Sequence, residues 1–416
     1  MFLALKIKNC SSFGDEQLFS VLANNKIKDK LVFNIQDKYS ILPSMVVFGA
    51  NASGKSNLLN IFFLLGCYSS YRTISDPFVL DAKYKNQPSS ICYKSFIDEY
   101  IIEYTIDIKD NVITKENLYL KKSNDKKITI FKRQQKEKID DIYSYSISYN
   151  ANMFNNKVYK EGLEKLTPPN KLLLKSLIEN NNGFKNTTKE TKEQLSIIVK
   201  FHNELISYVN QKFENESLYE RFINEEKFRN KVNQLINRID LGVKGINLTK
   251  EEIPKDNDNI DASKYEYKKE FLYYENETNK EIHFQRHMVS KGTNNAYELF
   301  LQIINTLEKG LVLVVDEIES SLHPYIVRII IELFNNEKIN KNKAQLICST
   351  HDVSLLDEDL FRADQIYFTE KNTKQMTEIF SLNDFKPRKG NNIRNRYMDD
   401  RYGGVPKICN LEDIFE

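Results

Sequence analysis

The chain has 416 residues, of which 41% are apolar and 28% are charged, enough for a globular protein with two or three lobes and a sizeable core. Its 60 Lys and Arg residues are nearly balanced by 58 Asp and Glu residues, so the net charge of +2 gives no support to nucleic-acid binding through overall charge. Any basic patch must therefore be local.

No apolar run approaches the roughly 18 residues of a membrane-spanning helix, and the N-terminal stretch "MFLALKIKNC" carries charges too early for a signal peptide. The five cysteines are scattered without C-x-x-C spacing, which favours free thiols in a reducing compartment. We therefore expect a cytoplasmic protein that does not associate with a membrane.

The predicted elements change character along the chain. The first 50 residues read as strands that end in the apolar run "SMVVFG", and a helix then continues to about Gly66. Residues 90–150 alternate apolar and polar side chains, as in "EYIIEYTIDI", which indicates an antiparallel sheet. Residues 160–240 place apolar side chains at helical spacing, as in "KEQLSIIVKFHNELISYV", which indicates a helical lobe.

Strands are expected again at "YEYKKEFLYYEN" and "KEIHFQRH", followed by a helix over "NAYELFLQIINTLEKG" and further strand and helix signals. No internal repeat is visible. This order predicts three parts: an N-terminal lobe over residues 1–159, an inserted helical lobe over 160–245 and a C-terminal lobe over 246–416.

The stretch "FGANASGKSN" at residues 48–57 has the phosphate-loop pattern G-x-x-x-x-G-K-[ST]. Gly49 and Gly54 allow successive N–H groups to point at phosphate oxygens, and Lys55 adds a positive charge toward the β- and γ-phosphates. A β-branched strand precedes the loop and an amphipathic helix follows it, as this loop requires. The predicted nucleotide-binding residues of the stretch are Gly49, Asn51, Gly54, Lys55, Ser56 and Asn57.

A second motif, "LVLVVDEIE", is a continuous apolar strand that ends in Asp316 and Glu317, which is typical of a Walker B strand buried beside a nucleotide. Asp316 is expected to bind Mg²⁺ through water, and Ser56 of the phosphate loop to bind the same ion. Glu317 is expected to orient and deprotonate the attacking water. The two motifs together predict an enzyme that hydrolyses ATP with Mg²⁺.

More than half of the chain separates Lys55 from Asp316, whereas hexameric AAA+ motors usually hold both motifs within one small domain. Upstream of Asp316, "HMVSKGTNNAYELF" has the layout of an ABC signature loop. Ser290 and the backbone around Gly292 would lie at a helix N-terminus and bind the γ-phosphate of a nucleotide held by another subunit. Lys291 takes the place of a glycine of transporters, which counts against a transporter subunit.

Beyond Walker B, "AQLICSTHD" places His351 at a strand end, where its imidazole would reach the γ-phosphate as a switch histidine. Residues 320–323 occupy the place of a D-loop. His283 and His287 have the spacing of a metal pair, but they lie on strand-like sequence without nearby carboxylates and are interpreted as structural. The glutamine that senses Mg²⁺ in such ATPases is left unassigned, with Gln87 a candidate by position alone.

Four segments in this order resemble the ABC-type, SMC-like AAA family ATPases of bacterial abortive-infection and phage-defence operons: "FGANASGKSNLLN", "SKGTNNAYELF", "LVLVVDEIESSLHP" and "ICSTHDVSLLD". They are similar to the ATPase half of overcoming-lysogenization-defect proteins and of PARIS-type systems. The tail "RYMDDRYGGVP" also resembles the ending of that group, except that Asp400 replaces a small residue. The resemblance covers most of the chain and implies an α/β fold, an ABC-type P-loop ATPase head with an antiparallel β subdomain and an inserted helical lobe.

The resemblance also implies a homodimer, or a higher even oligomer, and a separately encoded effector. The sequence has no deaminase pattern, no Cys/His cluster and no Ser/His/Asp elbow, and the segment after His351 is shorter than the roughly 100 residues of a typical domain. We therefore expect an ATPase that acts as a sensor or scaffold. Its expected partners are a TOPRIM-type nuclease and a phage-derived trigger.

The alternative function is that of a DNA-repair ATPase that clamps DNA in the manner of recombination mediators. The basic segments "KKSNDKKITIFKRQQKEK" and "KPRKGNNIRNR" leave direct contact with DNA or RNA open, because phosphates need only a few well-placed Lys and Arg side chains. A solvated hairpin and a solvated tail explain the same charges. A neighbouring nuclease gene would favour the defence function, whereas ATP-dependent binding to bare duplex DNA would favour repair.

Overall fold

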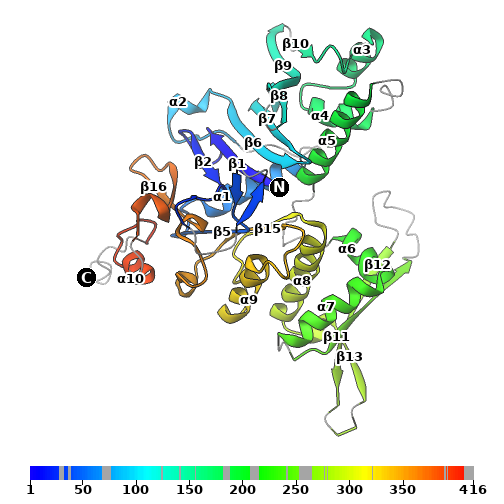
Figure 1. The fold of residues 1–416 in the computed structure, drawn as a ribbon, viewed down its shortest axis with the longest axis vertical. Helices are drawn as coiled ribbons and strands as arrows, with labels where there is room; N and C mark the ends of the chain where they lie inside the picture. Colours follow the sequence, from blue (N-terminus) through cyan, green and yellow to red (C-terminus); the bar gives the residue numbers. More distant parts are fainter. Residues whose placement is uncertain are drawn as a thin grey trace.

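The computed structural model describes most of the chain. The described ranges are 1–27, 32–35, 39–67, 76–122, 125–139, 142–154, 156–180, 188–206, 215–239, 242–252, 265–275, 277–278, 280–320, 322–387, 390 and 392–406. Two large sheets form the body of the molecule, and a small sheet projects from it (Figure 1). Within the described ranges, no helix combines the length and the apolar character needed to cross a bilayer.

The larger sheet is antiparallel throughout. In spatial order its strands are β10 (Ile142–Tyr149), β9 (Ile128–Ile139), β8 (Val112–Lys122), β7 (Tyr100–Lys109), β6 (Ser89–Ile97), β1 (Phe2–Lys8) and β2 (Gln17–Ser20). Along β7 every second side chain is buried, because one face of the sheet covers the core and the other faces solvent. The antiparallel sheet expected over 90–150 is confirmed, and β1 and β2 extend it.

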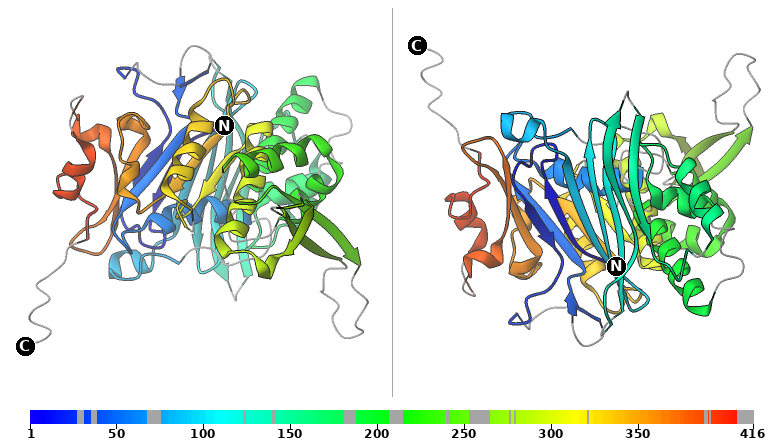
Figure 2. Two further views of the ribbon diagram at one scale, coloured as in Figure 1. Left: turned by 90° about the horizontal axis from the view of Figure 1, so that it is seen from below. Right: turned by 90° about the horizontal axis from the view of Figure 1, so that it is seen from above.

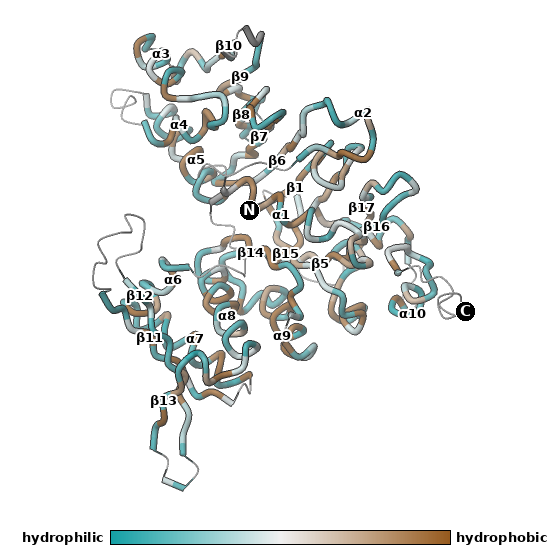
Figure 3. Tube along the Cα trace, turned by 180° about the vertical axis from the view of Figure 1, so that it is seen from behind, coloured by the Kyte–Doolittle hydropathy of each residue, from teal (hydrophilic) through white to brown (hydrophobic). Residues whose placement is uncertain are grey.

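The second sheet carries the phosphate loop. In spatial order its strands are β14 (Val312–Val315), β15 (Gln345–Ser349), β5 (Ser44–Gly49), β16 (Ile366–Lys371) and β17 (Thr377–Ser381). Neighbouring strands are parallel except for the β16–β17 pair. The three strands β5, β14 and β15 are buried along their whole length, and Figure 3 shows their apolar sequences at the centre of the molecule.

Side chains of β5 point alternately into two hydrophobic cores. Met45 and Val47 join the core shared with the antiparallel sheet and with α1 (Lys55–Cys67). Val46 and Phe48 join the core shared with two helices, α8 (Lys291–Lys309) and α9 (Pro324–Asn335). The strand before the phosphate loop is therefore held on both faces.

Helices are present over residues 157–238 as expected, but they divide between these two cores. The first group contains α3 (Lys157–Lys165), α4 (Leu173–Glu179) and α5 (Lys189–Ile206), and the second contains α6 (Glu216–Asn224) and α7 (Glu226–Arg238). In the first group, the ring of Phe201 packs against Tyr93 and Tyr104 of the antiparallel sheet, with centroids 5.9 and 5.7 Å apart. The second group packs against α8. The domain boundaries at 160 and 245 stay a prediction.

A three-stranded sheet, here called the arm, projects from the body next to α8. Its strands are β11 (Gly245–Glu252), β12 (Tyr265–Tyr274) and β13 (Glu281–Gln285). In both views of Figure 2, the arm and the short helix α10 (Ile393–Met398) lie at opposite ends of the molecule. A buried ion pair joins the arm to α8: the Lys269 ammonium lies 2.5 Å from the Glu298 carboxylate, which also accepts a hydrogen bond from the Tyr219 hydroxyl.

Replacing Glu298 by Ala is expected to lower the free energy of unfolding by about 3–5 kcal/mol, because it removes the buried carboxylate that pairs with the Lys269 ammonium and accepts the Tyr219 hydroxyl. Denaturant unfolding of the purified variant measures this loss. Replacing Glu225, an exposed partner of Arg221, by Ala is the control and should cost less than about 1 kcal/mol. Equal losses in the two variants would contradict the structural importance of the buried pair.

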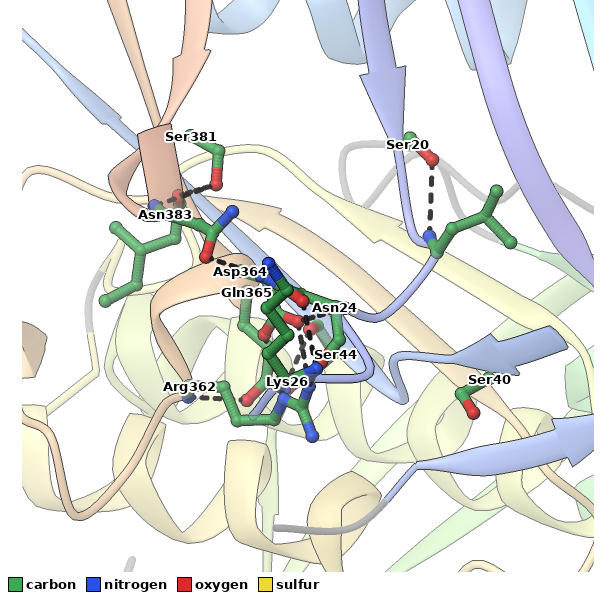
Figure 4. A network of polar contacts seen from close by, with 12 residues as sticks. Ser20, Asn24, Lys26, Ser40, Ser44, Arg362, Asp364, Gln365, Ser381 and Asn383 are labelled. Atoms are coloured by element: carbon green, nitrogen blue, oxygen red, sulfur yellow. Dashed lines mark hydrogen bonds and ion pairs between the residues drawn. The ribbon is translucent and has the colours of Figure 1, made fainter. Parts of the chain in front are cut away.

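A polar network fixes β5 and β16 at their amino ends (Figure 4). The Gln365 side-chain amide donates a hydrogen bond to the Ser44 carbonyl oxygen at 3.0 Å, and the buried Arg362 pairs with Asp364 at 2.8 Å. Asp364 also accepts a hydrogen bond from the Asn24 backbone at 2.7 Å. These contacts set the two strands side by side at the end opposite the phosphate loop.

Candidate functional site

The turn between β5 and α1 requires glycine at two positions. Gly49 and Gly54 have φ angles of +154° and +114°. A Cβ atom on Gly49 would lie 2.5 Å from the Thr369 carbonyl oxygen, and one on Gly54 would overlap the Thr377 hydroxyl. Because β16 and β17 pack this closely behind the turn, only glycine fits, and the backbone follows the tight path of a phosphate loop.

Lys55 begins α1 and folds back over this loop. The residue is only 4% exposed, and its ammonium donates hydrogen bonds to the carbonyl oxygens of Gly49 at 2.7 Å and Ala50 at 2.9 Å. Burial lowers the pKa of Lys55 to about 8, although the carboxylates that follow β14 act in the opposite direction. The loop thus holds a cation for which a phosphate would be a better partner than two carbonyl groups.

ATP affinity is expected to fall as the pH rises above 8, because unliganded Lys55 then loses the charge that binds phosphate. The fall should approach about tenfold per pH unit, since each binding event then takes up one proton. Calorimetric titrations at pH 7, 8 and 9 in buffers of different ionisation enthalpy measure both quantities. Lys55→Arg keeps its charge and should lose this proton uptake, whereas wild-type affinity that is constant from pH 7 to 9 would contradict the prediction.

Asp316 and Glu317 follow β14 and meet Ser349, the last residue of β15. The Ser349 hydroxyl donates a hydrogen bond to Asp316 Oδ1 at 2.5 Å and accepts one from the Glu317 backbone at 2.8 Å. Glu317 has a φ angle of +51° and is exposed. Both carboxylates therefore stand at the carboxyl ends of parallel strands, the edge at which open α/β sheets bind their ligands.

His351 lies at the same edge because β15 runs between β5 and β14. Its backbone N–H donates a hydrogen bond to Glu319 Oε1 at 2.6 Å, which ties the loop after β14 to the loop after β15. Sequence reasoning misses Glu319, although the last carboxylate of "DEIE" is a signal for it. The contact makes Glu319 a candidate positioning residue for His351.

Replacing Glu319 by Ala is expected to lower kcat for ATP hydrolysis about 10–100-fold with little change in ATP affinity, because the loop of His351 loses its anchor while Lys55 keeps its place over the phosphate loop. Glu319→Gln keeps an acceptor oxygen at the same place and should retain most of the activity. Steady-state kinetics combined with ATP titration separates the two effects. Similar losses of kcat in the Ala and Gln variants would argue that charge, and not positioning, is what Glu319 supplies.

A cavity of about 600 Å³ opens beside the phosphate loop. Its walls include Asn51, Ser53, His351, Lys371, Tyr397 and Gly404. The last two residues belong to the C-terminal tail, a contribution for which the sequence gives no signal. Tyr402 in the same tail is 4% exposed and stacks on Phe368 at 5.8 Å, so its ring is part of the core.

The remaining residues predicted from the phosphate-loop stretch occupy different places. Asn51 is exposed and lines the cavity, and Ser56 is half-buried in the first turn of α1. The Asn57 side-chain amide donates a hydrogen bond to the Ser12 hydroxyl at 2.8 Å. Asn57 therefore links α1 to the turn after β1, while its contact with nucleotide stays a prediction.

Ser290 and Gly292 lie apart from these residues. Ser290 caps α8, where its hydroxyl accepts a hydrogen bond from the Thr293 backbone at 3.0 Å, and it remains exposed together with the helix N-terminus. Among the residues that the structure describes, neither Ser290 nor Gly292 lines the cavity at the phosphate loop. Their action on the nucleotide of another subunit stays a prediction.

Gln87 is bonded to the turn that follows β1. It lines a different cavity, which shares no residue with the one at the phosphate loop, and its carbonyl oxygen accepts a hydrogen bond from the Asn9 side chain at 2.8 Å. The segment that carries Gln87 packs beside β1, and its role as the glutamine that senses Mg²⁺ stays a prediction.

His283 has two carboxylate neighbours, Glu281 on its own strand and Glu270 on the neighbouring strand of the arm, so the expectation that it lacks them is wrong. Its ring nitrogens lie 3.0 Å from Glu270 and 2.8 Å from Glu281, and these hydrogen bonds raise the pKa of His283. Periodicity alone does not reveal such pairs, because Glu270 belongs to another strand. Over the described ranges, no group of three His, Cys, Asp or Glu side chains is suited to a metal ion.

Residues 44–357, well over half of the chain, match the family model described as "AAA domain, putative AbiEii toxin, Type IV TA system". The chain belongs to this AAA family. In this AAA protein, the matched range contains the phosphate loop, Ser290, Asp316 and His351. The fold class expected from the sequence, an α/β ATPase head with an antiparallel β subdomain, is confirmed.

Solved structures similar to this AAA protein include an SMC head domain from Thermotoga maritima, with 12% identity, a TM-score of 0.39 and coverage of 91% of this chain and 98% of that one. The SmcHead bound to the C-winged helix domain of ScpA has 12% identity, a TM-score of 0.44 and coverage of 93% and 99%. The recombination mediator protein RecF has 12% identity, a TM-score of 0.35 and coverage of 91% and 98%. No curated protein matches the chain.

Proposed function

We propose that this AAA protein binds and hydrolyses ATP with Mg²⁺ at a site that a second copy of the chain completes. The observation that carries the proposal is that Lys55, Asp316 and His351, from three distant segments, share one edge of the five-stranded sheet. Their chemistry suits phosphoryl transfer, which needs a cation for the phosphates, a carboxylate for the metal and polar groups around the transferred phosphate.

In this proposal Lys55 exchanges its two carbonyl partners for phosphate oxygens, while the N–H groups of the loop and of the first turn of α1 bind the same anion. The Ser56 hydroxyl and the Asp316 carboxylate are oxygen ligands of the kind that Mg²⁺ prefers, and the bound ion would neutralise phosphate charge. Glu317 accepts the proton of the attacking water, and His351 contacts the γ-phosphate.

A second subunit supplies Ser290 and the backbone around Gly292. The exposed N-terminus of α8 supports this part of the proposal, because a helix N-terminus attracts anions and neither Ser290 nor Gly292 lines the cavity beside the phosphate loop of its own chain. A homodimer with two composite sites is the smallest assembly that completes both, and ATP would favour its closed state.

We further propose that the nucleotide state controls a separately encoded effector in an antiphage system, most specifically a TOPRIM-type nuclease. Two points support this proposal: the family description names a toxin of a toxin–antitoxin system, and the motifs resemble those of overcoming-lysogenization-defect and PARIS-type ATPases. The helical lobe or the tail around Tyr402 would hold the effector, and because the Tyr402 ring is buried, a contact through the tail would fall on its exposed neighbours.

Phage challenge of cells that express this chain with or without its genomic neighbour tests the effector proposal. Protection is expected only when both genes are present and Lys55 is intact, because ATP binding sets the state that holds the effector. Protection by this chain alone, or nuclease activity of the purified wild-type chain that a Glu317 variant loses, would refute the two-component system.

The basic hairpin of β8 and β9 supports direct nucleic-acid binding less than the motifs support the control of an effector. Lys127 pairs with Glu103 at 2.7 Å and lies over the Tyr119 ring at 3.8 Å, as expected of a solvated sheet surface. The other basic segment, 386–396, lies partly outside the described residues. ATP-dependent binding of the purified chain to bare duplex DNA would instead favour the DNA-repair alternative.

A further inference from the structure

The C-terminal tail, residues 397–406, packs against the phosphate loop although it lies outside the range that matches the AAA family. Figure 1 shows α10, the helix in which the tail begins, beside β16 and far from the arm. Tail residues form one wall of the 600 Å³ cavity, and the phosphate loop and His351 form the others. Any molecule that fills this cavity therefore contacts both.

Aromatic side chains anchor the tail to the strands that hold the loop. The Tyr397 ring stacks on Phe368 of β16 with centroids 5.3 Å apart, and lies 6.3 Å from Phe48, the residue before the first glycine of the loop. Tyr402 stacks on Phe368 at 5.8 Å. Because these rings are buried, the tail sits on the same core as β5 and β16.

Gly404 brings the tail backbone into direct contact with the loop. It has a φ angle of +77°, and its carbonyl oxygen accepts a hydrogen bond from the Tyr397 hydroxyl at 2.9 Å. A Cβ atom here would lie 3.3 Å from the Thr369 carbonyl oxygen and 3.5 Å from the Cα atom of Gly49. A Cβ atom at this position would strain the turn and crowd the Thr369 carbonyl oxygen, and the branches of a larger side chain would extend from a point already in van der Waals contact with the first glycine of the phosphate loop.

We propose that the tail is a wall of the ATP site, and that tail docking and ATP binding stabilise each other. The proposal rests on the proposed ATPase function and adds residues that the phosphate loop alone does not supply. If the docked tail raises ATP affinity by some factor, bound ATP must strengthen tail docking by the same factor, because binding linkage is reciprocal.

Gly404→Val tests the proposal in the full chain, with Mg²⁺ and ATP as the ligand in calorimetric titrations. We expect about tenfold weaker ATP binding, within the range of typical coupling between sites. Gly390→Val is the matched control: Gly390 also has a positive φ angle, +83°, but a Cβ atom on it would have no neighbouring atom within 4 Å. The control variant should bind ATP within about twofold of wild type, because strain alone does not reach the loop.

Two further measurements keep the test valid if Gly404→Val fails to fold. Tyr397→Phe removes only the hydrogen bond to Gly404 and should weaken ATP binding about two- to threefold. In the wild-type chain, amide hydrogen exchange of residues 397–406 should slow by about tenfold when ATP is added, since docking and binding are linked.

The outcomes separate this proposal from the proposed function. Wild-type protein that does not bind ATP, or a Lys55→Ala variant that binds it equally well, would overturn the ATPase proposal and the tail proposal with it. Binding that depends on Lys55, but is equal in Gly404→Val and Gly390→Val and leaves tail exchange unchanged, would overturn the tail proposal alone.

Discussion

Replacing Glu317 by Gln is expected to leave ATP binding intact and to lower kcat for hydrolysis about 10²–10⁴-fold, the usual contribution of a general base. The substitution is local, because the Glu317 side chain is exposed and its backbone N–H keeps its bond to the Ser349 hydroxyl. ATP titration and steady-state hydrolysis of the same preparation measure the two properties separately. Lys55→Ala should instead abolish binding.

Glu332→Gln on α9 is the control for this substitution, since it neutralises an exposed carboxylate away from the strand ends. The control should hydrolyse ATP at the wild-type rate. Wild-type hydrolysis by the Glu317 variant would show that another group activates the water, and Glu319 would then be the first candidate because it neighbours both Lys55 and His351.

Mixing a Lys55→Ala chain with a Gly292→Asp chain is expected to restore ATP hydrolysis that neither variant performs alone. Each single variant damages both sites of its homodimer, whereas a mixed dimer has one site with an intact phosphate loop and an intact signature loop. Random mixing should therefore give about a quarter of the wild-type activity, by the two-fold symmetry of the assembly. Hydrolysis rates across a series of mixing ratios measure the recovery.

A mixture of Lys55→Ala with Glu317→Gln chains is the matched control. Both residues lie at the same edge of one chain, so each site of the mixed dimer keeps one defect and no activity should return. Absence of rescue in the first mixture, once heterodimers have been demonstrated in it, would indicate a site completed within a single subunit.

The sequence predicts those parts of the site that are contiguous. A single turn contains Gly49, Gly54 and Lys55, so their spacing in the sequence is enough to predict its geometry. The continuous apolar run before Asp316 predicts a buried strand, as the structure has it. The antiparallel sheet can also be predicted from the sequence, because the alternation of apolar and polar residues along β7 indicates a strand with one buried face. These features depend on neighbours in the chain.

Contacts between distant segments were beyond sequence reasoning. The bond from the His351 backbone to Glu319 and the contact of Gly404 with the phosphate loop join elements that no local pattern pairs. Likewise, the amphipathic pattern of α5 and α7 predicts that one face of each helix is buried, but not against which sheet. Gln87 likewise stays a candidate by position alone, because position in the chain does not fix position in space.

The buried pair of Lys269 and Glu298 joins the arm to α8, so that the two elements move together. Ser290 caps the same helix that carries Glu298, and this helix is packed against α6 and α7 along its length. In the proposed dimer, a displacement of the arm would therefore be passed through α8 to Ser290 at the composite ATP site. A protein that grips the arm would then change the rate of ATP turnover from a distance, and closure of the dimer would swing the arm in return.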